Sequence, residues 1–123
     1  MNTLTRIVTA AAVAAVTLST AAAPAGAGAF HAWAVADVPT WDTLNVRAWP
    51  SSKSQILVAY PNGTLLSMTG KCTGGVQLDT VAALPAWQQR AAVRGVWCEA
   101  WIDPQGNGNY RTAWVYGKYI APA

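Results

Sequence analysis

The sequence feature that most constrains the fold is a regular alternation of short β-prone segments with turn-forming residues. The segments are rich in Val, Ile, Leu, Trp and Tyr, and several of them alternate apolar with polar positions, as half-buried strands do. They cover residues 32–38, 44–48, 56–60, 64–69, 96–102 and 110–115, and residues 116–120 close the chain. Strong turn signals, such as Pro61-Asn62-Gly63 and the polar segment Asp103–Asn109, separate them. This pattern predicts a small all-β domain, either a barrel or a sandwich.

Residues 70–95 interrupt the alternation. The segment Pro85–Val93 (PAWQQRAAV) suits a short helix, because proline is favoured in a first helical turn and Gly95 follows the end. A helix of this length is stable only when it docks against the rest of a domain. We therefore predict a short helical insertion in the sheet.

The N-terminal residues have the composition of a secretory signal peptide. Met1–Arg6 carries one positive charge, and Ile7–Leu18 is an uncharged apolar run that is too short to span a bilayer. Small residues from 19 to 29 then offer A-x-A cleavage sites. A buried Ala-rich helix is the alternative, but the run has no amphipathic stripe.

Cleavage at these sites would start the mature chain at Gly28 or Phe30. The prediction is thus a signal peptide over residues 1–29 and one domain over residues 30–123. The mature chain contains no second long apolar run, so we expect no membrane attachment after cleavage. The expected location is secreted or periplasmic.

Two cysteines, Cys72 and Cys98, flank the expected helix. An even pair in an exported chain indicates a disulfide. A metal or redox pair is the alternative, but the spacing is not C-x-x-C and the one histidine, His31, is distant in sequence. We expect a structural disulfide that stabilises the fold by about 3 kcal/mol in the chain-entropy treatment, and no metal or other cofactor.

The charges are few and dispersed. After removal of Arg6 with the signal peptide, seven basic and five acidic residues remain, a net charge of +2. No cluster of Lys and Arg is present, which argues against a nucleic-acid partner. Glu99 and Asp103 are the only acids close enough in sequence to suggest a catalytic pair, and solvated surface charge is the favoured interpretation of both. We therefore expect a protein that is not an enzyme.

Five segments follow one another along the chain: LNVRAWP at 44–50, ILVAYPNGT at 56–64, LLSMTG at 65–70, VWCEA at 96–100 and WVYGKYI at 114–120. In this order they resemble the bacterial SH3 domain family. Two features depart from the family pattern: Ala113 replaces the glycine that usually precedes the closing Trp, and the insertion at 70–95 is longer than the usual loop. The resemblance implies a small SH3-like antiparallel barrel of five to six short strands. It also implies a recognition module found outside the cytoplasm, often with cell-wall or peptide ligands.

The resemblance also implies a ligand groove lined by aromatic side chains. Strand parity places Trp97 and Trp101 on the face opposite Cys98, so an inward Cys98 turns both tryptophans outward. By resemblance, Trp97, Tyr116 and Tyr119 are the candidate ligand-binding residues, although Tyr119 has the alternative of filling the core.

Trp49, in a loop beside Pro50, is a further candidate near the same groove. The expected ligand is a peptide or a peptidoglycan fragment, because aromatic grooves dock extended peptides and stack on sugar rings. The alternative function is a secreted interaction or structural protein that binds a protein partner, or itself, through exposed tryptophans such as Trp87. The sequence does not define the oligomeric state.

Overall fold

The structure, a computed structural model, describes residues 31–123, so the predicted signal peptide at 1–29 lies outside the described residues. Within residues 31–123 the longest helix has 8 residues, and no helix is long and apolar enough to cross a membrane.

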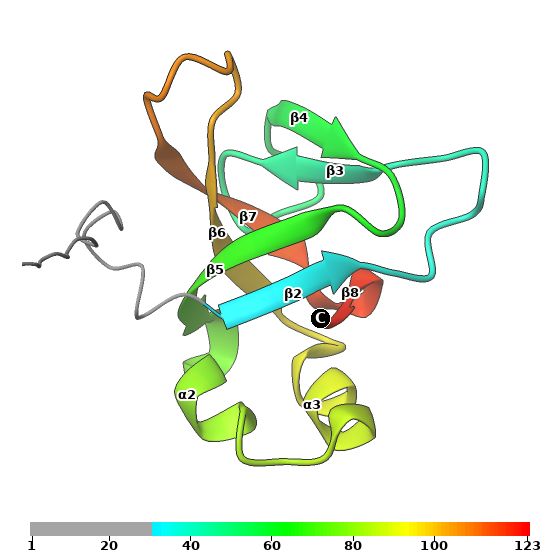
Figure 1. Ribbon diagram of the computed structural model, residues 1–123. Helices are drawn as coiled ribbons and strands as arrows, with labels where there is room; N and C mark the ends of the chain where they lie inside the picture. Colours follow the sequence, from blue (N-terminus) through cyan, green and yellow to red (C-terminus); the bar gives the residue numbers. More distant parts are fainter. Residues whose placement is uncertain (1–30) are drawn as a thin grey trace, which may run out of the picture.

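Within the described residues, seven strands form one antiparallel sheet in the order β4-β3-β7-β6-β5-β2-β8 (Figure 1). The strands are β2 (His31–Val35), β3 (Leu44–Arg47), β4 (Ile56–Tyr60), β5 (Leu65–Cys72), β6 (Trp97–Ile102), β7 (Arg111–Tyr116) and β8 (Ile120–Pro122). Every neighbouring pair is antiparallel. This antiparallel sheet confirms the predicted all-β fold class. In the part of the chain that the structure describes, β4 and β8 are the edge strands and the sheet is not closed into a barrel.

The sheet has an inner and an outer face, and strands β6 and β7 near its centre show which side chains lie on each. On β6, Cys98 and Ala100 are fully buried while the side chains of Trp97 and Trp101 lie on the opposite face, as strand parity predicts. On β7, Val115 is fully buried. The core of the domain therefore lies on the inner face. Its buried residues are Trp33, Val35, Val38, Leu44, Val46, Leu66, Met68, Cys72, Cys98, Ala100, Ile102, Ala113, Val115 and Ile120, together with Leu78, Val81 and Val93 from the segment between β5 and β6.

The insertion between β5 and β6 packs below the sheet (Figure 1). It contains a 3-10 turn, η4 (Thr73–Gly75), and two helices, α2 (Leu78–Val81) and α3 (Ala86–Val93). The predicted helix is thus confirmed, with Pro85 at its N-cap. Docking supplies the stability that so short a helix lacks, because the side chain of Val93 is fully buried in the core and α3 packs against β8.

The disulfide between Cys72 and Cys98 is present, with an S–S bond of 2.03 Å. The two residues are partners in the β5–β6 ladder, and both are buried. The bond therefore closes the base of the whole insertion, as expected from the sequence.

Several element boundaries differ from the sequence-based prediction. Strand β2 ends at Val35 rather than residue 38, because the chain turns at Asp37, which has a positive φ of 63°. Asp tolerates this left-handed conformation better than most residues. The closing segment 116–120 contains the last residue of β7, the 3-10 turn η5 (Gly117–Tyr119) and the first residue of β8.

Candidate functional site

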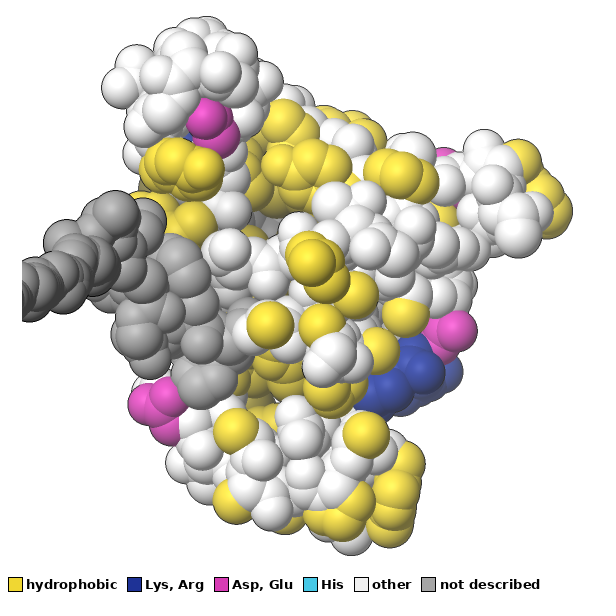
Figure 2. Space-filling view, viewed as in Figure 1, with side chains coloured by type: hydrophobic (Ala, Val, Ile, Leu, Met, Phe, Trp, Pro, Cys, Tyr) yellow, Lys and Arg dark blue, Asp and Glu magenta, His cyan; other side chains and the backbone are white. Residues whose placement is uncertain are grey.

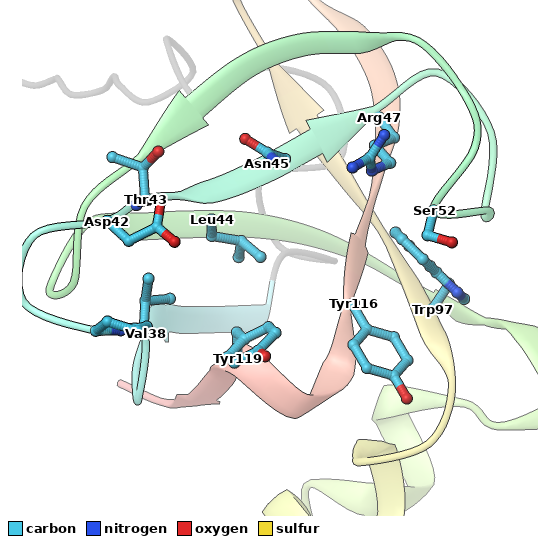
Figure 3. A pocket seen from close by; sticks show the side chains of 11 residues that line it. Val38, Asp42, Thr43, Leu44, Asn45, Arg47, Ser52, Trp97, Tyr116 and Tyr119 are labelled. Atoms are coloured by element: carbon cyan, nitrogen blue, oxygen red, sulfur yellow. Dashed lines mark hydrogen bonds between the residues drawn. The ribbon is translucent and has the colours of Figure 1, made fainter.

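A groove of about 620 Å³ opens on one side of the sheet, between the loop that joins β2 to β3 and the loop that joins β3 to β4 (Figure 3). The residues that line it are Val38, Pro39, Asp42, Thr43, Leu44, Asn45, Arg47, Ser52, Trp97, Tyr116 and Tyr119. Strands β3, β6 and β7 and the turn η5 form its framework, so the lining comes from elements that are far apart in sequence.

Three aromatic rings follow one wall of this groove. Trp97 and Tyr116 are cross-strand partners on β6 and β7, and their ring centroids are 5.2 Å apart. The turn η5 then places the Tyr119 ring 6.2 Å from that of Tyr116, edge to face. These are favourable aromatic geometries. The structure therefore brings together three of the four residues that the sequence suggested, and we name them the aromatic row.

The position of Tyr119 is compatible with both roles that the sequence left open. Its side chain is partly buried and packs against the core, and it also lines the groove. Trp97 and Tyr116 are likewise partly buried, so each ring presents only part of its surface to a ligand. Partial burial fixes the rings in place before any ligand arrives, which lowers the entropic cost of binding.

Trp49, the fourth candidate, does not line the groove. Its side chain is 70% exposed in the loop between β3 and β4. The backbone of this loop is held by Ser54, whose Oγ donates to the Trp49 carbonyl oxygen at 2.9 Å. Ser52, in the same loop, is the residue that reaches the groove.

Two charged residues in the groove were not singled out from the sequence. Arg47 lies at the end near Trp97, and Asp42 lies at the other end, in the loop between β2 and β3 (Figure 3). Strand parity does place Arg47 on the face opposite Val46. Its position near Trp97, however, depends on the pairing of strands that are distant in sequence. Asp42 lies in an irregular loop, where strand parity does not apply.

The groove wall formed by the β2–β3 loop is anchored at two points. Asn62, in the turn after β4, accepts a hydrogen bond from the Val38 amide at 3.0 Å and donates one to the Val38 carbonyl oxygen. Asp37 forms an ion pair with Arg90 on α3. The insertion and the turn after β4 therefore both hold this loop against the domain.

The acidic residues considered as a catalytic pair have separate structural partners. Glu99 accepts a hydrogen bond from the Thr69 hydroxyl at 2.9 Å. Asp103 accepts hydrogen bonds from the amides of Asn107 and Gly108, at 3.1 and 2.8 Å, and so stabilises the loop between β6 and β7. Within the groove lining, Asp42 is the single carboxylate. The groove thus presents apolar rings with one cation and one anion, which is a set of groups suited to recognition.

Comparison of the chain with protein-family models, with curated proteins and with solved structures finds no match.

Proposed function

We propose that this protein is an exported binding module that holds a peptide or a peptidoglycan fragment in the groove without catalysing a reaction. The observation that carries the proposal is the aromatic row of Trp97, Tyr116 and Tyr119 along a groove of about 620 Å³. This volume falls within the range of ligand pockets in proteins. Pre-positioned aromatic rings dock extended peptides, and their faces also pack against the C–H groups of sugars.

We further propose a relationship to the bacterial SH3 family. The motif residues support it, since LNVR forms β3, ILVAY forms β4 and WCEA begins β6, and each of these strands is antiparallel to its neighbours. The residues that the resemblance suggested as ligand contacts also lie beside one another. An aromatic groove between two loops is the site that such a relationship would predict.

The test is a pull-down of the mature protein with purified, insoluble peptidoglycan, with supernatant and pellet compared on a gel. We expect the wild type to pellet and the double variant Trp97→Ala, Tyr116→Ala to stay in the supernatant. Trp87→Ala is the matched control, because it removes a 70% exposed indole on α3 outside the groove. Thermal melting establishes that each variant is folded at the assay temperature. A wild-type protein that stays in the supernatant would contradict wall binding.

A second candidate function is binding of a protein partner, or of another copy, through exposed tryptophans. The observation in its favour is the exposure of Trp41, Trp49 and Trp87, which are 86%, 70% and 70% exposed. Figure 2 shows hydrophobic side chains at the outer tip of the β2–β3 loop. Self-association in sedimentation that Trp49→Ser or Trp87→Ser abolishes would support this function, and a strictly monomeric protein would contradict the self-associating form.

A further inference from the structure

The groove has opposite charges at its two ends. Arg47 ends β3, and Asp42 precedes the start of the same strand at Leu44. A strand advances roughly 3.3 Å per residue, so the stretch from Leu44 to Arg47 alone separates the ends by roughly 10 Å. Neither residue forms an ion pair with another residue in the described range 31–123. Both charges are therefore available to a ligand that lies along the aromatic row.

Arg47 is held in position before a ligand binds. Its Nη1 donates to the carbonyl oxygen of Ser54 at 2.7 Å, which uses one of the five N–H donors of a guanidinium. The side chain is partly buried, and Trp97 and Ser52 line the groove at the same end. A fixed guanidinium with free donors is the side-chain group best matched to a carboxylate, which it binds through two parallel hydrogen bonds.

Asp42 sets the direction in which a ligand can lie. Its Oδ1 accepts the Thr43 amide at 2.8 Å, and the side chain is exposed at the groove rim. A carboxylate placed at this end would meet a like charge, which is unfavourable, whereas an amine or an amide N–H would be attracted. The charge pattern therefore disfavours a ligand bound in reverse.

We infer that the groove captures its ligand by a free carboxylate bound to Arg47, with the apolar body of the ligand along the aromatic row and a cationic or N–H group at Asp42. The ligand class is an extended peptide that carries a free carboxylate at one end. This inference rests on the proposed function and adds the ligand group and its orientation. An uncharged sugar ring, which the aromatic row alone would also accept, offers Arg47 only neutral hydroxyl oxygens and no carboxylate for a bidentate, charge-assisted pair.

The test uses insoluble peptidoglycan from which phosphate polymers have been removed, so that its carboxylates are the remaining anions. One portion is left intact, and in the other the carboxylates are converted to amides with a carbodiimide and ammonia. The wild-type protein is titrated with both. We expect binding to the amidated material to be weaker by roughly tenfold or more, since hydrogen bonds to charged groups are worth that much. This comparison uses only the wild-type protein, so its result does not depend on the folding of a variant.

Two variants locate the effect in the groove. Arg47→Gln removes the charge, and we expect it to bind both materials equally and as weakly as the wild type binds the amidated one. Arg111→Gln is the matched control, because Arg111 is exposed at the opposite end of β7 from Tyr116 and does not line the groove. We expect it to retain the wild-type preference for free carboxylates.

The outcomes separate the two proposals. Equal wild-type binding to intact and amidated peptidoglycan would overturn the carboxylate inference and leave the proposed function standing. A preference for free carboxylates that Arg47→Gln keeps, in a variant that melts as the wild type does, would also overturn it. Wild-type protein that binds neither material would overturn the proposed function together with the inference.

Discussion

Gly117 lies so close to the C-terminal end of α3 that a Cβ atom on it would be 1.8 Å from the carbonyl oxygen of Val93. The same glycine donates its amide hydrogen to the carbonyl oxygen of Val96 at 2.8 Å. Gly117 begins η5, the turn that carries Tyr119 into the groove. The contact therefore links the position of α3, in the insertion, to the position of Tyr119, a candidate ligand-binding residue.

We predict that Gly117→Ala destabilises the protein, because the obstructing atoms belong to the backbone and cannot rotate away. Overpacking of this kind costs about 1–3 kcal/mol, and we expect α3 to lose its contact with η5. Thermal or urea unfolding measures the change. Gly95→Ala is the matched control, since nothing lies within 4 Å of its Cβ position. A Gly117→Ala protein as stable as the Gly95→Ala protein would contradict this packing.

The disulfide supplies a second stability prediction. Replacing both Cys72 and Cys98 with Ala should lower the free energy of unfolding by about 3 kcal/mol, because the open chain of the unfolded state gains freedom. Urea unfolding with and without a reducing agent measures it. The reductant should destabilise the wild type and leave the double variant unaffected. Equal sensitivity of both proteins to the reductant would contradict the disulfide as the cause of the difference in stability.

The strands were predictable from sequence because their signals are local. Residues 56–60 form β4 as expected, and the parity of Trp97 and Cys98 follows from alternation along a single strand. The helix α3 was predictable from Pro85 and the glycine beyond its end. The short α2 (Leu78–Val81) was not, since four residues are too few to display a helical period.

The candidate site was predictable only in part, for a physical reason. Trp97 and Tyr116 were suggested by family resemblance, and the strand register then makes them neighbours. The placement of Asp42 depends on a loop whose path is set by distant contacts, namely Asn62 with Val38 and the ion pair of Asp37 with α3. Such long-range contacts leave no periodic signal in the sequence.

Tyr60 gives rise to a pH-dependent prediction. Burial raises the pKa of its phenol above the ordinary value of 10.0, and the negative charges of the Asp103 carboxylate and the Tyr110 phenolate raise it further. The folded protein therefore keeps this proton to higher pH than the unfolded chain does. The resulting stabilisation is fully present below about pH 10, the ordinary tyrosine pKa, and is lost as the pH rises through the folded-state pKa.

We expect the free energy of unfolding to fall above pH 10 with a smaller slope in Tyr60→Phe than in the wild type. Urea unfolding at a series of alkaline pH values measures the slope. Phenolate absorbance of the folded wild type should include a component that titrates above the ordinary value and that Tyr60→Phe lacks. Identical slopes in the two proteins would show that Tyr60 ionises equally in the folded and unfolded states.

Asn62 connects the stability of the β2–β3 loop to binding. Its side chain forms two hydrogen bonds with the backbone of Val38, which lines the groove. Asn62→Ala should lower the free energy of unfolding by about 1–2 kcal/mol, because both Val38 backbone groups lose a partner in a partly buried place. Amide hydrogen exchange at Val38 should become faster, and peptidoglycan binding should weaken, since a loose wall must be ordered when the ligand binds.

The matched control is Asn107→Ala, which alters the exposed loop between β6 and β7 outside the groove. It should leave both exchange at Val38 and binding unchanged. Faster exchange with unchanged binding would mean that the ligand does not contact the wall that Asn62 holds, and would confine recognition to the aromatic row and Arg47.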